Sequence, residues 1–293
     1  MNIIQALIDA FSSGALYALA ALGIGLVFGV MRLANFAHGE LITIAAYTVV
    51  LTWHYGALVS IVLSLIAAVV LALLLEFAVF RRLRTANPAT LLIASFGLSF
   101  LLRRVYEIAF GNNVRTAAVA TGLARTVDVA GTRVQMLSVV TIVAAGVLLL
   151  ALHQFLNRSS LGLQVQAAST DFRTARLLGV RANQVIALTF AISGVLAAVV
   201  AFVLVVQTGA VGPSFGVNVT VLALIGAVIG GIDKLTSSLV GGFLVGFATS
   251  LLTTYLPVDL VNFRHAFVFA LVMVVLIVKP SGLLVRGPAL ERA

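Results

Sequence analysis

Long apolar stretches, each with few or no charges, occupy most of the chain between residues 6 and 278. In the stretch 57–80, for example, Glu76 is the only charged residue. An α-helix needs about 20 such residues to cross the roughly 30 Å of hydrocarbon in a bilayer, and it satisfies its own backbone N–H and C=O groups there. Strands of a membrane barrel would be about half as long and would alternate polar with apolar residues. The chain is therefore predicted to be an all-α polytopic membrane protein.

The composition excludes an ordinary soluble protein. Of the 293 residues, 62% are hydrophobic and only 9% are charged, against about 25% charged in soluble domains. Membrane lipid is the expected solvent, because so few charges cannot cover a water-facing surface. The net charge of +9 is attributed to cytoplasmic loops, which collect Lys and Arg, and no nucleic acid partner is expected. The absence of cysteine excludes disulfides and thiolate metal sites.

Nine segments are candidate spans, so eight or nine transmembrane or re-entrant helices are expected within a single transmembrane domain, 1–293. The second segment starts with a stretch, NFAHGE, that is too polar to face lipid, and it is predicted to be a broken or re-entrant helix. The seventh is short and ends at Gly230 and Gly231. It is either a half-helix that lines a cavity or a span in a thinned bilayer. The segments are 6–30, 35–51, 57–80, 89–110, 136–156, 185–208, 217–232, 239–256 and 266–278.

Basic residues orient these segments. Clusters of Lys and Arg follow the third, fifth, seventh and ninth segments, and two spans separate each cluster from the next. All of these clusters therefore lie on one side of the membrane. The bias towards positive charge predicts that this side is cytoplasmic, with the loop 157–184 and the C-terminus. The N-terminus is then outside if the second segment crosses.

The loop 157–184 contains a short patterned segment. Asp171 lies in a favourable position at a helix start, and Gly179 supplies a C-terminal stop. Between them, a helix would place Phe172, Ala175 and Leu178 on one face and two arginines on another. Such a helix is too short to be stable alone in water. It must dock on the bundle or on a partner.

Several motifs give the chain a resemblance to a known family. They are residues 158–162 (RSSLG), 175–180 (ARLLGV) and 185–190 (VIALTF), the stretch 35–40 (NFAHGE) after a first span that contains 14–19 (GALYAL), and the hairpin from Gly230-Gly231 to Gly241-Gly242. In their order and spacing they resemble the permeases of branched-chain amino acid ABC transporters, the LivH type. The resemblance covers nearly the whole chain. The chain departs from the EAA-Gly signature of other importers, because the run 166–168 (QAA) has no Glu and no Pro follows Gly179 at the expected place.

The resemblance implies an ABC importer permease fold in the cytoplasmic (inner) membrane of a bacterium. It implies a permease subunit of an ATP-driven importer that translocates amino acids, branched-chain ones above all, delivered by a periplasmic binding protein. The other partners would be a second, related permease subunit and two cytoplasmic ATPase subunits, which bind the ATP, so this chain itself would carry no cofactor. The segment 171–180 would be the ATPase-coupling helix, and its alternative is an interfacial helix that binds only lipid. The expected coupling residues are Asp171, Phe172, Arg173, Ala175, Arg176, Leu177, Leu178 and Gly179.

Ionisable residues at membrane depth are candidates for function because they are costly there. Asn35, His38 and Glu40 are predicted to line the substrate pathway, since donors, acceptors and the free backbone of a broken helix suit both ends of an amino acid zwitterion. They could instead form a polar hinge against the second permease. Arg103 is expected to pair with Glu107 at i, i+4. Weaker candidates for the pathway are Gln207, Thr208, Asn218 and Thr220.

The sequence gives little support to an enzyme. It contains no GxxxxGK[ST] and no HExxH motif. Its four histidines lack metal-ligand spacing, so no catalytic residue and no metal are expected. The alternative function for this chain is that of an ion-coupled secondary transporter of small polar solutes. That mechanism requires buried titratable groups in the middle of the bundle, and only His38 and Glu40 would serve.

Overall fold

The computed structural model of the chain describes residues 3–32, 34–83, 86–129, 132–232, 234–279 and 282–283. Within these ranges, seven helical stretches are long and apolar enough to cross a membrane, and two more apolar helices are shorter. The prediction of an all-α membrane protein with eight to nine spanning or re-entrant helices is confirmed. The long ones are α1 (Ile3–Met31), α3 (Ala57–Leu75) continued by a π-helical turn (Glu76–Phe80) and α4 (Arg81–Leu83), α5 (Pro88–Phe110), α6 (Met136–Arg158), α9 (Ala182–Thr208), α11 (Leu235–Tyr255) and a 3-10 turn (Val258–Phe263) continued by α12 (Arg264–Val278); the short ones are α2 (His38–Thr52) and α10 (Val217–Gly230).

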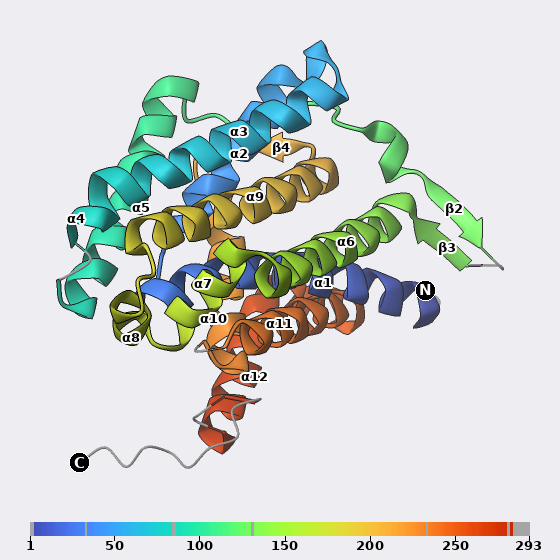
Figure 1. Cartoon of the computed structure of the whole chain (residues 1–293). Helices are drawn as coiled ribbons and strands as arrows, with labels where there is room; N and C mark the ends of the chain where they lie inside the picture. Colours follow the sequence, from blue (N-terminus) through green and yellow to red (C-terminus); the bar gives the residue numbers. More distant parts are fainter. Residues whose placement is uncertain are drawn as a thin grey trace.

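Small elements mark the two ends of this bundle. At one end, β1 (Arg115–Thr116) pairs with β4 (Ala210–Val211), and β2 (Thr126–Val129) pairs with β3 (Thr132–Gln135), both antiparallel. This is called the hairpin end. At the other end lie α4, α7 (Ser160–Thr170) and α8 (Phe172–Leu177), which is called the α8 end (Figure 1). The N-terminus lies at the hairpin end (Figure 1).

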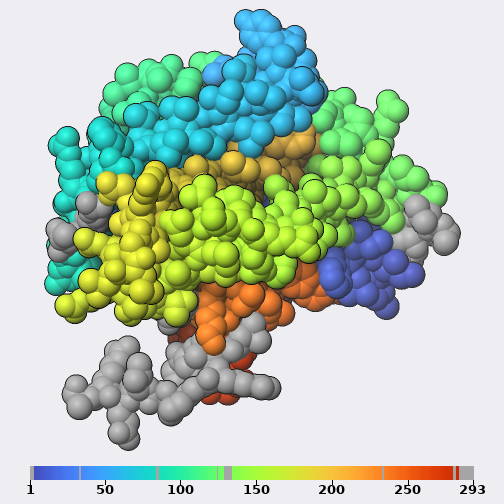
Figure 2. All heavy atoms as spheres, in the orientation of Figure 1, coloured from blue at the N-terminus to red at the C-terminus, as the bar shows by residue number. Residues whose placement is uncertain are grey.

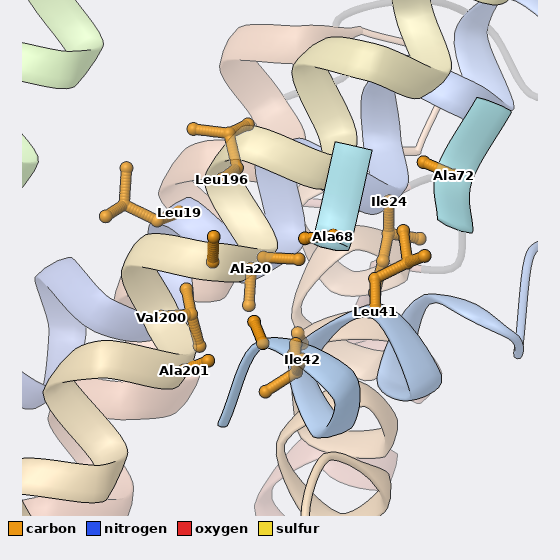
Figure 3. Close-up of a cluster of buried hydrophobic side chains, with 14 of the residues drawn as sticks. Leu19, Ala20, Ile24, Leu41, Ile42, Ala68, Ala72, Leu196, Val200 and Ala201 are labelled. Carbon is orange, nitrogen blue, oxygen red and sulfur yellow. The ribbon is translucent and has the colours of Figure 1, made fainter. Parts of the chain in front are cut away.

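The helix α1 is the centre of the bundle. In the most apolar 18 residues of α1, 78% of the residues are buried. In the most apolar 18 residues of the stretch Val258–Val278, which contains α12, only 6% are buried. Figure 2 shows that α6 and α7 cover most of α1 on one face and leave only its N-terminal end visible there. The core around α1 combines side chains from α1, α2, α3 and α9 (Figure 3), including Ile24, Leu41, Ala72 and Val200. The outer faces of α3, α5, α6 and α12 expose apolar side chains, as expected of surfaces in contact with lipid.

Glycines allow the closest helix contacts. A Cβ added to Gly242 would lie 2.4 Å from Cβ of Ala21 in α1, and one added to Gly226 would lie 2.7 Å from Cα of Gly242. The α10–α11 hairpin and α1 therefore pack backbone against backbone, which supplies the dispersion contacts that hold helices together in lipid.

The second span is broken in the half of the bundle nearer the α8 end. After α1 the chain turns back, and residues 34–37 are not helical. Ser95 of α5 supports this backbone, because its hydroxyl donates to Ala34 O (3.2 Å) and accepts from Phe36 N (3.4 Å). The helix α2 starts at His38, beside Gly23 of α1, about two turns inside the bundle. From there α2 continues to the hairpin end, so the segment is broken and crosses.

The segment around α10 is broken in the opposite half. After α9 ends at Gly209, the chain forms β4 at the hairpin end and then turns back into the bundle as far as Gly216. The N–H of Gly216 donates to the Thr43 hydroxyl of α2 (3.0 Å). There α10 begins and runs to the α8 end, with a length of about 21 Å. This geometry matches the half-helix alternative. The N-termini of α2 and α10 thus meet inside the bundle, where a Cβ on Gly216 would lie 2.0 Å from the carbonyl oxygen of Gly39.

The two ends differ in charge as the sequence predicts. Because the α8 end is the more basic, we expect it to face the cytoplasm. Among described residues, the α8 end has Arg32, Arg81, Arg82, Arg158, Arg173, Arg176, Arg181, Lys234 and Lys279, and the hairpin end has Arg115, Arg125, Arg133 and Arg264.

The absence of native cysteine makes this orientation testable. Ser160 at the α8 end and Thr121 at the hairpin end are both exposed. We expect Ser160→Cys to react with an impermeant thiol reagent only from the cytoplasmic side, and Thr121→Cys only from outside. Labelling of intact cells and of inverted vesicles measures this. Reaction of both positions from the same side would contradict the topology.

Candidate functional site

Asn35 shapes the start of α2. It is 1% exposed, and its Oδ1 accepts from Ala37 N (3.1 Å), which closes a turn just before the helix. Its Nδ2 is buried and has no hydrogen-bond partner in the described part of the chain. Asn35 therefore stabilises the turn before α2 through Oδ1, and its Nδ2 donor is not used by the described part of the bundle.

His38 lies in the first turn of α2 and is fully buried. Its Nδ1 is 3.0 Å from the Ser193 hydroxyl of α9. The ring packs against α1, where a Cβ on Gly23 would lie 2.8 Å from Cε1. The Nε2 atom has no partner among the described residues. His38 thus joins the broken helix to the two most central helices.

Glu40 faces α5 instead. It is fully buried, and its Oε1 accepts from the Ser99 hydroxyl (2.8 Å). Its backbone carbonyl accepts from the Tyr106 hydroxyl (3.0 Å). Oε2 has no partner among the described residues, which is costly for a carboxyl group in an apolar bundle.

The structure brings the three predicted pathway residues to one helix start but aims them differently. His38 and Glu40 are two positions apart, about 200° around a helix. His38 therefore points to α1 and α9, and Glu40 to α5. The three side chains do not form a single pocket.

A cavity of about 230 Å³ lies beside Glu40, between α5 and the N-terminus of α10. Two of the residues in its wall, Arg103 and Thr220, each have a buried atom, Nε and Oγ1, without a hydrogen-bond partner in the described chain; Thr220 Oγ1 lies beside Gly39 of α2. The pairing predicted between Arg103 and Glu107 is wrong, because Arg104 Nη1 binds Glu107 Oε2 at 2.6 Å. The lining consists of aromatic, aliphatic and polar side chains: Phe36, Phe96, Ser99, Phe100, Arg103, Val217, Thr220 and Val221.

Sequence reasoning found only part of this cavity. Thr220 was a weak candidate, and Arg103 was noted only as a partner for Glu107. The rings of Phe96 and Phe100 carry no signal that separates them from lipid-facing aromatics. A second cavity, of about 270 Å³, lies near the hairpin end and includes Gln207 and Arg264.

The loop 157–184 forms two helices: α7, which was not predicted, and α8, which lies within the candidate coupling segment 171–180. Asp171 caps α8: its Oδ1 accepts from the N–H groups of Arg173 (3.0 Å) and Thr174 (3.1 Å), and its Oδ2 accepts from the Thr174 hydroxyl. These bonds, the Thr174 hydroxyl first, hold the pKa of Asp171 below its usual value of 3.8. The stabilisation from this cap is therefore complete at neutral pH, and it is lost only as the pH falls through the lowered pKa.

Gly179 ends the segment in the manner predicted. Its φ is 91°, in the left-handed region that favours glycine. Gly179 N donates to Arg176 O and Val180 N donates to Ala175 O, both at 3.1 Å. This is the pattern of a Schellman motif, which satisfies the last carbonyls of a helix.

The faces of α8 differ from the prediction. Ala175 is buried and Phe172 is half-buried against the bundle core. Leu178 does not share their face, because the helix ends at Leu177 and the chain turns away. Leu177 and Leu178 are 83% and 82% exposed. Arg173 and Arg176 are exposed too, so Phe172 and Ala175 fasten α8 to the bundle, and the leucines and arginines remain available to a partner.

The helix α7 connects α8 to the centre. A Cβ on Gly162 would lie 2.2 Å from Phe155 O of α6, and one on Gly29 of α1 would lie 3.4 Å from Cβ of Ser169. Force applied to α8 would therefore reach α1 through a single short helix.

Comparison with known proteins gives consistent results. A family model described as the permease component of branched-chain amino acid transport systems matches residues 6–277. The high-affinity branched-chain amino acid transport system permease protein BraD of Pseudomonas aeruginosa is 29% identical over 307 residues, which cover 99% of this chain and 97% of that protein. The permease LivH of Escherichia coli K12 is 29% identical over 304 residues, with the same coverage. Among solved structures, a chain of PsaBC from Streptococcus pneumoniae in complex with Fab has a similar fold, with a TM-score of 0.52, 13% identity and coverage of 93% of this chain and 91% of that one.

Proposed function

The chain belongs to the family of permease components of branched-chain amino acid transport systems, and from this premise we propose that it is the membrane-spanning subunit of an ATP-driven ABC importer for amino acids. A periplasmic binding protein delivers the substrate at the hairpin end, and two cytoplasmic ATPase subunits bind at the α8 end. A second permease, a related chain, completes the membrane part in the cytoplasmic membrane of a bacterium. ATP is bound by the ATPase subunits.

The observation that carries this proposal is the pair of exposed leucines on a rigidly capped helix at the basic end of the bundle. Asp171 and Gly179 fix both ends of α8, so Leu177 and Leu178 are presented in a defined position. A helix of six residues with two exposed leucines is small for an independent lipid anchor, which depends on a large buried apolar face. It suits a groove on a soluble partner, because two aliphatic side chains flanked by arginines form a compact contact.

The same geometry suggests how ATP hydrolysis would reach the substrate path. Movement of α8 passes through α7 to α1, which packs against α9, α10 and α11. His38 joins the start of α2 to α1 and α9. A shift of α1 would therefore act on the place where α2 and α10 meet. We assign Asn35, His38 and Glu40 to this substrate path. The binding protein, and not the permease, mainly selects among similar amino acids.

Reconstitution tests the proposal. The chain, expressed with the second permease and the ATPases, should purify as one complex, and proteoliposomes should take up leucine only with ATP and binding protein present. Dissipation of ion gradients should not reduce uptake. Uptake by the permease without ATPases, driven by a proton or sodium gradient, would instead identify an ion-coupled transporter in which His38 and Glu40 couple the ion.

A further inference from the structure

We propose that the cavity beside Glu40 is a binding site for one amino acid zwitterion with an apolar side chain. Arg103 binds the carboxylate, Ser99 and Thr220 bind the ammonium group, and the aromatic wall receives the side chain. This inference rests on the proposed function and adds a site within a single permease subunit.

The carboxylate end is defined by Arg103. A guanidinium group presents a planar set of donors that suits a carboxylate better than any other side chain does. Arg103 Nε is buried in the cavity wall without a hydrogen-bond partner in the described chain. Glu107, its neighbour one turn away, is bound to Arg104. The guanidinium of Arg103 lies over the Phe100 ring, with Cζ 5.3 Å from its centroid, and this contact uses none of its N–H donors, so they are available to a ligand.

The start of α10 adds to the positive potential at this point. Val217, the first residue of α10, lines the cavity. The Val217 N–H donates to Ser214 O (3.2 Å), so this helix start acts on an anion through the helix dipole and not through that N–H. The buried start of a broken helix is a recurrent site for the anionic group of a substrate in transporters.

The ammonium end is defined by hydroxyl groups and Glu40. Thr220 is 2% exposed, and its Oγ1 has no partner among the described residues. Ser99 uses its hydrogen on Glu40 Oε1, so its oxygen can only accept a hydrogen bond in the cavity. Glu40 lies behind Ser99 with Oε2 unpaired. Accepting oxygens next to a carboxyl group suit a donor with three hydrogens, as an ammonium group is.

The apolar wall determines the kind of side chain. The rings of Phe36 and Phe96, and those of Phe96 and Phe100, meet edge to face with centroids 5.2 Å apart. Val217 and Val221 lie across from them in the lining. An aliphatic side chain would be buried there favourably, whereas a charged one would lose its water without a partner. The volume of about 230 Å³ is smaller than the sites of drug-sized ligands, and it suits a single small molecule.

The experiment measures protection of a cysteine in the assembled transporter. Val221→Cys places the only thiol of the chain in the cavity wall, and Thr121→Cys, as a separate variant, places one at the exposed hairpin end outside it. Leucine should slow maleimide labelling at 221 and leave labelling at 121 unchanged. Leucinol, which lacks the carboxylate, and aspartate should protect poorly.

Arg103→Gln is then added to Val221→Cys. It should raise the leucine concentration for half-protection by about tenfold or more, because a charge-assisted bond is lost. It should also remove the preference for leucine over leucinol, a result that a merely structural arginine would not produce. Arg103→Lys should restore part of the preference.

Three results with leucine would overturn the site: no protection, equal protection of 121 and 221, and protection that Arg103→Gln leaves unchanged. Sensitivity of labelling to anionic lipid but not to leucine would assign Arg103 to a lipid headgroup and would also overturn it. ATP-dependent leucine uptake, measured on the same preparations, distinguishes failure of the site from failure of the proposed function. Uptake without protection refutes only the site. Absence of uptake in the unmodified transporter refutes the proposed function.

Discussion

Replacement of Leu177 and Leu178 together by aspartate is expected to abolish transport while the permease still inserts and folds. Both side chains are more than four-fifths exposed, so the change removes little contact within the chain. Burial of a leucine in a partner's groove contributes about 1.5–3 kcal/mol, and a carboxylate would have to be desolvated there instead. Each replacement should weaken ATPase binding by at least about tenfold. Capture of the ATPase by the tagged permease, and ATP hydrolysis linked to transport, measure the effect.

A matched control is available at the opposite end. Val258 is 88% exposed in the turn before α12, and Val258→Asp introduces the same chemistry far from α8. This variant should retain full ATPase capture. If the Leu177→Asp, Leu178→Asp variant binds and activates the ATPase as the unmodified chain does, α8 is not the coupling element.

Gly216→Val is expected to be the most damaging single change in the bundle. A Cβ at this position would lie 2.0 Å from Gly39 O and 3.0 Å from Cβ of Ile42. Neither can yield without separating α2 from α10. Overpacking of this kind costs about 3 kcal/mol or more, since a backbone and not a flexible side chain must move. The variant should fail to accumulate, or should unfold in detergent at a temperature roughly 10 °C lower.

Gly146→Val is the comparison for this change. Gly146 lies within α6 and has no atom within 4 Å of an added Cβ. Valine there should change the unfolding temperature little, although the same side chain is added. Equal behaviour of the two variants would show that the contact between Gly39 and Gly216 is not tight in the membrane.

The spans and the two broken segments could be predicted from the sequence because each rests on local chemistry. Uninterrupted apolar residues determine the long helices. The polar stretch from Asn35 to Glu40 indicates that the second span cannot be a continuous lipid-facing helix, and Gly230 and Gly231 indicate the end of α10. Gly179 was predicted correctly for the same reason, since a left-handed C-terminal position is a local property of the backbone.

Features that depend on distant contacts could not be predicted in the same way. Spacing alone allows Arg103 to pair with Glu107, and it does not show that Arg104 is better placed for this. The exposure of Leu178 follows from a helix that ends one residue earlier than its apolar pattern suggests. The cavity combines α5 with the start of α10, and no local pattern reports that these segments meet. The predicted roles of Asn35, His38, Glu40 and the α8 residues remain predictions.

The meeting of α2 and α10 also constrains the order in which the protein can be completed during synthesis. The start of α2 is polar and broken, and its partners are far away in the chain: Ser193 is 155 residues from His38, and Gly216 is 173 residues from Thr43. A polar segment cannot rest in lipid while it waits for these contacts. The start of α2 is therefore expected to reach its final contacts only after α9 and α10 have been synthesised, although α2 itself lies within the first fifth of the chain.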